Sequence, residues 1–111
     1  MEPSILKSTK KVLNLAPDYT AYDAQIITHI NSAFTTLNQL DLNATEGFKI
    51  TGYDETWFDY STDVNLINQV KNFIYLNTRL MFDPPTSGFD MQRQKDQIAE
   101  VTWRLSTITT T

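Results

Sequence analysis

Residues 63–82 read DVNLINQVKNFIYLNTRLMF, and this stretch decides the fold. Its apolar side chains recur at steps of three and four residues, which places them on one face of an α-helix. Asp63 precedes the helix and is placed to accept a hydrogen bond from a free N–H of the first turn. Asp83, Pro84 and Pro85 end the helix, because proline restricts the residue before it and has no N–H of its own. The pattern predicts a core helix in a small bundle, and its apolar face consists of Leu66, Ile67, Val70, Phe73, Ile74, Leu80 and Met81.

Asn77 lies in the middle of this apolar face. An amide left there without hydrogen-bond partners costs about 1–3 kcal/mol, so we predict a partner from a loop backbone group or from the second helix. Tyr75, Leu76 and Phe82 lie beside the apolar face and indicate neighbours on more than one side of the helix. Packing within one bundle explains them most simply, and contact of some of them with another subunit is the alternative.

The whole chain has 111 residues, a formal net charge of −4 and no cysteine. This length predicts one domain with its own core. The absence of cysteine excludes disulfides and thiolate metal sites, and the negative charge argues against a dedicated nucleic-acid binder, which normally has a basic face. No apolar run approaches the roughly 20 residues that cross a bilayer, and the N-terminus lacks the apolar core of a signal peptide. We therefore expect a soluble, mostly helical domain that is made inside the cell.

A short first helix is predicted over residues 4–13, with Ser4 as its cap. Apolar residues share one face, and Lys7, Lys10 and Lys11 project from the other. We interpret this lysine cluster as a solvated face with cations near the helix C-terminus. Binding of phosphate by the cluster is the alternative.

A second helix is predicted over residues 20–40, where an unbroken apolar stripe runs beside an almost uncharged polar face. Thr20 and Asp23 have the spacing of a capping box, in which each side chain satisfies the other's backbone N–H. His29 lies at the edge of the stripe with no acidic residue one helical turn away. We interpret it as a structural residue and not as a catalytic one.

Residues 41–62 are predicted to be a long irregular loop. Residues 48–51 alternate in polarity between two glycines, which predicts at most a short strand or hairpin. Residues 53–60 place aromatic side chains among carboxylates, but the spacing of an EF-hand and its central glycine are missing. We expect Trp57 to anchor this loop in the core. Presentation of Trp57 and Phe58 to a partner protein is the alternative.

A last helix is predicted over residues 87–105, with Ser87 as its cap. Trp103 faces away from its inner stripe, and an outward Trp is uncommon on a lone monomer, so it indicates an interface. Residues 106–111 are mostly β-branched and carry no charge, which predicts a frayed, extended tail. The inner stripe consists of Met91, Gln94, Ile98, Val101 and Leu105.

The sequence contains no recognisable catalytic constellation. We find no nucleophile with a base partner, no glycine-rich phosphate loop, no metal-ligand spacing and no dinucleotide fingerprint. The residues therefore predict a non-enzymatic domain without a cofactor or a metal, whose surface aromatics suit assembly.

As a whole the sequence resembles the head–tail connector, or adaptor, proteins of long-tailed bacteriophages and prophages. The most specific parts of the resemblance are residues 79–87, which read RLMFDPPTS, and residues 103–105, which read WRL. The chain departs from the usual pattern at residues 77–78, where a basic-plus-apolar pair is typical, and at residues 41–44, where a glycine-containing turn is. Further matching segments are residues 4–6, 10–11, 19–23, 27–32, 39–40, 47–48, 56–57 and 75–76.

This resemblance implies a structural virion protein and not an enzyme. Such adaptors form a dodecameric ring beneath the portal protein and dock the head-completion or stopper protein on the other side. Double-stranded DNA passes through the ring without sequence-specific binding, and an acidic wall rich in polar amides suits this because it does not hold phosphate. We accordingly expect the chain in the host cytoplasm before assembly and in the virion afterwards, with no membrane partner.

The resemblance and the residue pattern together predict the contacts. Residues 1–105 form the adaptor domain, and residues 106–111 form a flexible tail that engages the portal, as a strand added to a sheet edge. Aromatic anchors carry much of the energy at interfaces, so the surface aromatics are further candidates. Asp83, Pro84, Pro85 and Asn77 are predicted to be structural. The candidates for partner binding are Trp57, Phe58, Tyr75, Trp103, Arg104, Thr107, Ile108 and Thr109.

Two other functions remain open from the sequence. A small helical DNA-packaging or regulatory DNA-binding protein would need a recognition helix with several Arg or Lys on one face, and we do not interpret any predicted helix as one. An unrelated helical adaptor that binds a peptide in a groove is the other alternative.

Overall fold

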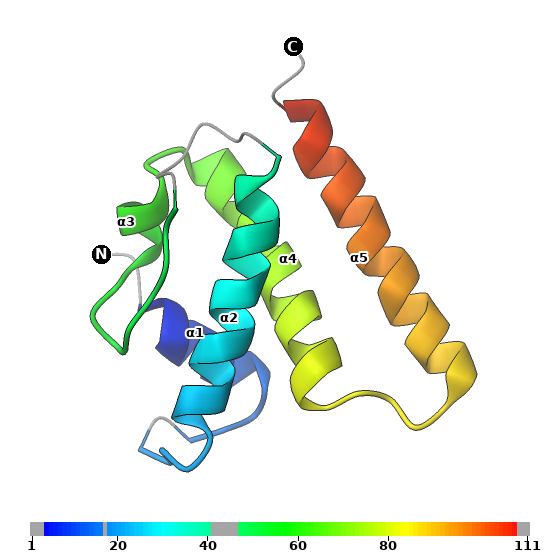
Figure 1. Cartoon of the computed structure of the whole chain (residues 1–111), viewed down its shortest axis with the longest axis horizontal. Helices are drawn as coiled ribbons and strands as arrows, with labels where there is room; N and C mark the ends of the chain where they lie inside the picture. The colour runs from blue at the N-terminus through cyan, green and yellow to red at the C-terminus, as the bar shows by residue number, and fades with distance from the viewer. Residues whose placement is uncertain (1–3, 17, 41–46, 109–111) are drawn as a thin grey trace.

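The computed structural model describes residues 4–16, 18–40 and 47–108, and these ranges form five α-helices (Figure 1). No strand occurs in the described ranges, where an isolated antiparallel bridge pairs Ser4 with Thr56. The prediction of a small all-α bundle is therefore confirmed. The helices are α1 (Ile5–Val12), α2 (Asp23–Asn38), α3 (Trp57–Tyr60), α4 (Val64–Phe82) and α5 (Gly88–Ile108).

The central helix is α4, against which the other four helices pack. The carboxylate of Asp63 caps its first turn as predicted, by accepting two backbone N–H groups at 3.1 and 3.3 Å. At the other end Asp83 is the C-cap and donates its backbone N–H to the carbonyl of Arg79 at 2.8 Å. The chain then leaves the helix at Pro84 and Pro85, so the predicted bounds of this helix are confirmed.

The apolar face of α4 differs from the prediction in its last turns. It continues from Ile74 to Thr78, four residues on, and Thr78 is fully buried. Asn77 lies at the edge of this face and is only half-buried, while Met81 is 47% exposed. The expectation that Asn77 faces the core is therefore wrong. After Ile74 the next buried position lies four residues on, so Thr78 takes the core position in place of Asn77.

The first helix, α1, has caps at both ends. The Oγ of Ser4 accepts the N–H of Lys7 at 3.3 Å, which confirms the predicted N-cap. After the helix Asn14 adopts a positive φ of 62°, and the N–H of Leu15 binds the carbonyl of Lys10 at 2.9 Å. This is a Schellman motif with Asn14 in the left-handed position. The side chain of Lys10 does not project into solvent as predicted, because the residue is fully buried.

The start of α2 also differs from the prediction. The helix begins at Asp23, and the residue before it, Tyr22, makes no side-chain cap. The carboxylate of Asp23 binds Lys10 and Tyr53 instead, so the predicted capping box of Thr20 and Asp23 does not form. A charged partner from another helix competes successfully with a free backbone N–H.

The loop between α2 and α4 is held by side chains in place of a hairpin. Residues 41–46 lie outside the described ranges, and residues 47–51 form no strand. The side-chain amide of Asn31 binds both backbone groups of Ile50, at 2.9 and 2.8 Å. The short helix α3 was missed by the sequence analysis, although Thr56 precedes it and Asp59 accepts the N–H of Thr56 at 2.8 Å, a capping pair.

Three aromatic rings join this loop to the core. Phe34, Phe48 and Tyr60 contact one another with centroid distances of 5.0 to 5.5 Å. Burial raises the pKa of Tyr60 to about 12, because the charged phenolate is disfavoured away from water. These ring contacts and the hydrogen bonds between Asn31 and the backbone of Ile50 together anchor the loop on the core.

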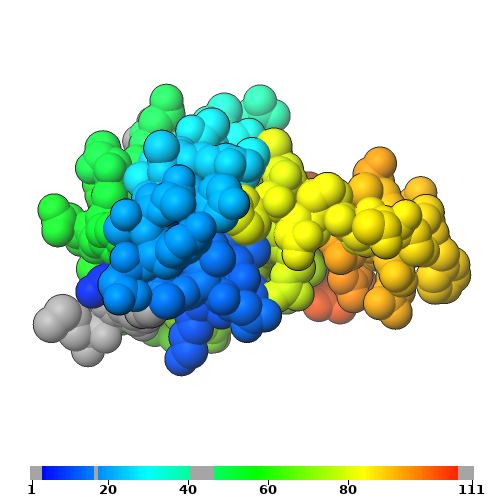
Figure 2. All heavy atoms as spheres, turned by 90° about the horizontal axis from the view of Figure 1, so that it is seen from below, coloured from blue at the N-terminus to red at the C-terminus, as the bar shows by residue number. Residues whose placement is uncertain are grey.

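The last helix, α5, lies at the outer edge of the bundle and packs against α4. Figures 1 and 2 show α1 and α5 on opposite sides of α4. The first turn of α5 is capped as predicted, because the Oγ of Ser87 accepts the N–H of Asp90 at 3.2 Å. The predicted inner stripe is confirmed, since Val101 and Leu105 are buried and Met91, Gln94 and Ile98 are half-buried.

The C-terminal end of α5 corrects the predicted tail. The helix continues to Ile108, so residues 106–108 are helical and not extended, and residues 109–111 lie outside the described ranges. The hydroxyls of Ser106 and Thr107 donate to carbonyls in the preceding turn at 2.7 and 2.8 Å. Buried Leu105 holds this turn on the bundle. Packing thus overrides the weak helix propensity of β-branched residues.

Candidate interaction surfaces

A groove of about 640 Å³ opens between α1 and α4. Three of its lining residues are lysines, so positive charge gathers here in a chain whose net charge is −4. Lys7 and Lys11 are exposed and form no ion pair with an acidic residue of the described ranges. We refer to this surface as the lysine groove, which is lined by Lys7, Ser8, Lys11, Val12, Leu15, Lys71 and Tyr75.

Trp57 supports the lysine groove from within the core. Its indole N–H donates to the hydroxyl of Ser8 at 3.3 Å, and its ring meets the ring of Tyr75 edge to face at 6.0 Å. The ammonium of Lys71 lies over the indole, 5.6 Å from the ring centroid. Trp57 is 0% exposed, so it anchors the loop as expected and is not itself available to a partner. Tyr75 is half-buried and reaches the surface in the groove.

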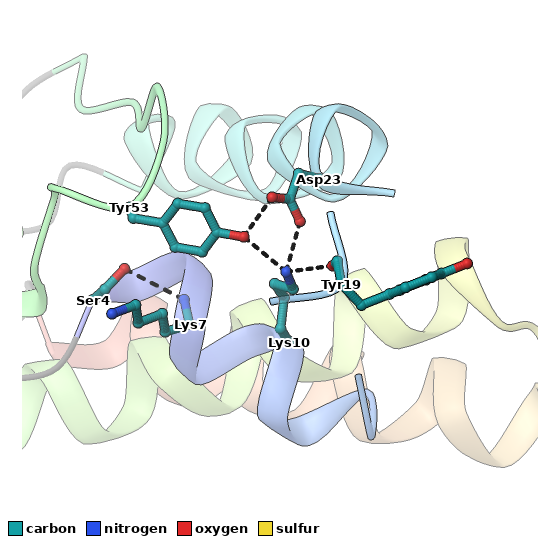
Figure 3. Close-up of polar contacts among 6 residues, drawn as sticks. All are labelled: Ser4, Lys7, Lys10, Tyr19, Asp23 and Tyr53. Atoms are coloured by element: carbon teal, nitrogen blue, oxygen red, sulfur yellow. Dashed lines mark hydrogen bonds and ion pairs between the residues drawn. The ribbon is translucent and has the colours of Figure 1, made fainter. Parts of the chain in front are cut away.

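Lys10, the remaining lysine of α1, forms a buried polar network (Figure 3). Its ammonium lies 2.8 Å from a carboxylate oxygen of Asp23 and donates to the hydroxyl of Tyr53 and the carbonyl of Tyr19, each at 2.7 Å. The hydroxyl of Tyr53 donates in turn to the other oxygen of Asp23. Three segments that are distant in sequence are thus joined at one charged centre, as Figure 3 shows.

The electrostatics of this network favour the charged forms. Burial opposes the charge on Lys10, but hydrogen bonds to Asp23 and Tyr53 and the attraction of the carboxylate outweigh burial and raise the pKa of Lys10. Burial likewise opposes the charge on Asp23, and the bonds from Lys10 and Tyr53 outweigh it and lower the pKa of Asp23. The pair is therefore ionised near neutral pH and serves to position α1 on α2.

Glu55 fixes the loop that leads to α3. Its carboxylate accepts the N–H and the hydroxyl of Thr51 at 3.0 and 2.8 Å and the N–H of Gly52 at 3.3 Å. Burial opposes ionisation, but these bonds outweigh it and lower the pKa of Glu55. Beyond this loop Phe58 is 45% exposed on α3, so it remains a candidate contact.

The side of α5 that is turned away from α4 carries the most exposed aromatic residues. Phe89 is 77% exposed and Trp103 is 66% exposed, which confirms the predicted outward direction of Trp103. Positions 89, 96 and 103 are spaced by seven residues and therefore share a face. Phe89 is not among the residues predicted to bind a partner, although its seven-residue spacing from Trp103 was the available signal. We define the outer face of α5 by Phe89, Asp96 and Trp103.

The predicted structural residues after α4 line a second pocket, of about 500 Å³. Asp83, Pro84 and Pro85 lie on its wall with Arg79. The guanidinium of Arg79 donates to the carbonyl of Val12 at 2.7 Å and so satisfies a backbone group at the end of α1. These residues hold the turn between α4 and α5 against α1.

The remaining candidates lie near the end of α5. Arg104 is exposed and its guanidinium donates to the carboxylate of Glu100 at 2.6 Å. Thr107 is half-buried, Ile108 is the last residue of the helix, and Thr109 lies outside the described ranges. The structure does not bring these residues together with Tyr75 or Phe58, which belong to other elements.

The described part of the chain contains no group of three or more His, Cys, Asp or Glu side chains placed to hold a metal ion. None of its helices combines the length and the apolar character needed to cross a membrane.

A family model described as Phage connector protein matches residues 5–111. The matched range includes all five helices. No curated protein and no solved structure matches the chain.

Proposed function

The chain belongs to the phage connector protein family, and from this membership we propose that it forms a dodecameric ring beneath the portal protein. In this ring the chain links the capsid to the head-completion or stopper protein and encloses part of the DNA path. It has no catalytic activity and assembles into the virion from the host cytoplasm. Its partners are the portal, the stopper protein and other copies of itself.

The outer face of α5 carries this proposal. A helix that packs on one side and exposes two large aromatic residues on the other suits a subunit that is buried again in an assembly. Trp103 is among the residue types that dominate binding energies at interfaces.

The polar and acidic character of the chain suits a DNA conduit. A net charge of −4 gives little counterion release on contact with duplex DNA. DNA then moves past the wall without being held by it. We expect no retardation of duplex DNA by the purified chain at physiological salt.

The portal protein of the same phage provides the direct test. The full-length chain is mixed with portal rings, and the complex is analysed by native mass spectrometry and by electron microscopy. We expect twelvefold rings of the chain, which give density at one end of the portal. A chain that stays monomeric and does not bind the portal would overturn the proposal.

A small helical DNA-packaging or regulatory DNA-binding protein is the second candidate. The lysine groove favours it, because three lysines converge on one surface. Retardation of duplex DNA with a steep dependence on salt, lost in Lys7→Gln and Lys11→Gln variants, would support this candidate. It would also contradict the conduit described above.

A further inference from the structure

We propose that the outer face of α5 on one copy docks in the lysine groove of a neighbouring copy. This inference rests on the ring proposed above and identifies the two surfaces that meet in it. One surface is a helix face with two exposed aromatic side chains and the carboxylate of Asp96, and the other is a basic groove with apolar walls.

The outer face of α5 has the features of a docking helix. Phe89 and Trp103 are about 21 Å apart along the axis, at 1.5 Å per residue, and Asp96 lies midway between them. The carboxylate of Asp96 accepts the side-chain amide of Gln92 at 2.9 Å. No Lys or Arg of the described ranges forms an ion pair with Asp96. The face therefore offers two aromatic anchors and a carboxylate that lacks a cation partner.

The lysine groove complements this face in charge and offers apolar walls to its aromatic side chains. Lys7 and Lys11 are exposed on α1, with apolar Val12 and Leu15 beside them. The ammonium groups are placed to receive Asp96, and the apolar side chains and the ring of Tyr75 are placed to receive Trp103.

A single copy cannot bring these two surfaces together. On α4 the groove is lined by Lys71 and Tyr75, whereas Asn72 and Leu76 line the pocket beside α5, about 100° further around the helix. Figures 1 and 2 place α1 and α5 on opposite sides of α4. An α5 face that occupies the groove must therefore belong to a second copy. A contact between two different surfaces is heterologous, and its repetition closes into a ring when the rotation allows.

Cysteine crosslinking tests this contact, because the chain has no cysteine of its own. Lys11→Cys and Asp96→Cys are made in separate full-length chains with different tags. The two are mixed and treated with a short bis-maleimide, both as concentrated free protein and on portal rings. We expect covalent dimers that contain one chain of each kind. A chain with both substitutions should give a ladder of larger oligomers, and neither single variant alone should give dimers.

The matched control is Gln25→Cys in place of Lys11→Cys, since Gln25 is an exposed residue of α2 outside the groove. Dimers from one single variant, an equal yield with the control, or no crosslink in either preparation would overturn the proposal. Portal binding of the unmodified chain is measured separately by co-sedimentation. Failure of the crosslink with portal binding intact rejects this contact alone, whereas failure of portal binding rejects the proposed function.

Discussion

The side chain of Asn31 takes the place of a neighbouring strand for Ile50. Its amide nitrogen donates to the carbonyl of Ile50 at 2.9 Å, and its amide oxygen accepts the N–H of Ile50 at 2.8 Å. Ile50 is buried, so both backbone groups need partners. A single residue of α2 thus fixes the loop that carries α3 and Trp57.

Replacement of Asn31 should therefore destabilise the whole domain. We expect Asn31→Ala to lower the free energy of unfolding by about 2–3 kcal/mol, because two backbone groups lose their partners. Urea denaturation followed by circular dichroism measures this change. Asn38→Ala is the control, since Asn38 is exposed on the same helix, and its effect should stay within about 0.5 kcal/mol. Equal effects of the two substitutions would show that the loop does not depend on Asn31.

Most of the fold follows from local patterns in the sequence. The bounds of α4 could be predicted because Asp63 and the Asp83, Pro84 and Pro85 turn act on neighbouring backbone groups. The inner stripe of α5 could be predicted because its period is helical and its partner is a single helix. Such signals depend on a few adjacent residues and need no knowledge of the tertiary arrangement.

The differences arise where a distant residue decides the outcome. Lys10 was placed in solvent because its partners, Asp23 and Tyr53, lie far along the chain. The same distant partner removed Asp23 from its predicted capping role. Residues 106–108 were assigned to a tail because propensity was weighed without the packing of Leu105. The lysine groove could not be predicted from the sequence for the same reason, since Lys71 lies beside the lysines of α1 only in the folded chain.

Removing one partner of the Lys10 and Asp23 ion pair should lower the free energy of unfolding more than replacing both partners. The side chain of Lys10 is 1% exposed, so Asp23→Asn leaves a buried ammonium without its counter-ion. We expect a loss of about 3–5 kcal/mol in the free energy of unfolding at pH 7. The double variant with Lys10→Met should regain much of this loss, because no buried charge is left unpaired. A double variant as unstable as Asp23→Asn would contradict this account.

The same network predicts how stability changes with pH. Asp23 has a lowered pKa, so its contribution is complete above its ordinary value of 3.8 and is lost as the pH falls through the lower folded value. Lys10 has a raised pKa, so its contribution is complete below 10.5 and is lost as the pH rises through the higher folded value. Unfolding measured across this range should show the stability gap between wild type and Asp23→Asn narrowing in acid. A gap independent of pH below 3.8 would be inconsistent with the lowered pKa of Asp23.

The two tryptophans should respond in opposite ways to truncation. Trp103→Ala should change the free energy of unfolding by less than about 0.5 kcal/mol, because the side chain is exposed. It should weaken ring formation or portal binding by about 30-fold, the effect of losing an aromatic anchor worth about 2 kcal/mol. Trp57→Ala should instead destabilise the monomer by about 3–5 kcal/mol, because it empties a buried site. Thermal unfolding and portal co-sedimentation separate the two effects, and normal assembly of Trp103→Ala would count against the outer face of α5 as an interface.

Truncation at the C-terminus tests whether this end of the chain docks on the portal. The helix reaches Ile108, so the segment available to a partner begins with a helical turn held by the hydroxyl bonds of Ser106 and Thr107. Deletion of residues 106–111 should remove this turn, leave the buried Val101 and Leu105 in place and abolish stable portal binding. Because the ring repeats each weak contact many times, even a small loss per subunit is multiplied in the assembly. Circular dichroism should show a nearly unchanged helix content, and co-sedimentation should show the loss. Deletion of residues 109–111 alone keeps the last turn and should retain part of the binding, whereas full binding by the longer truncation would mean that the portal contact lies on the helices.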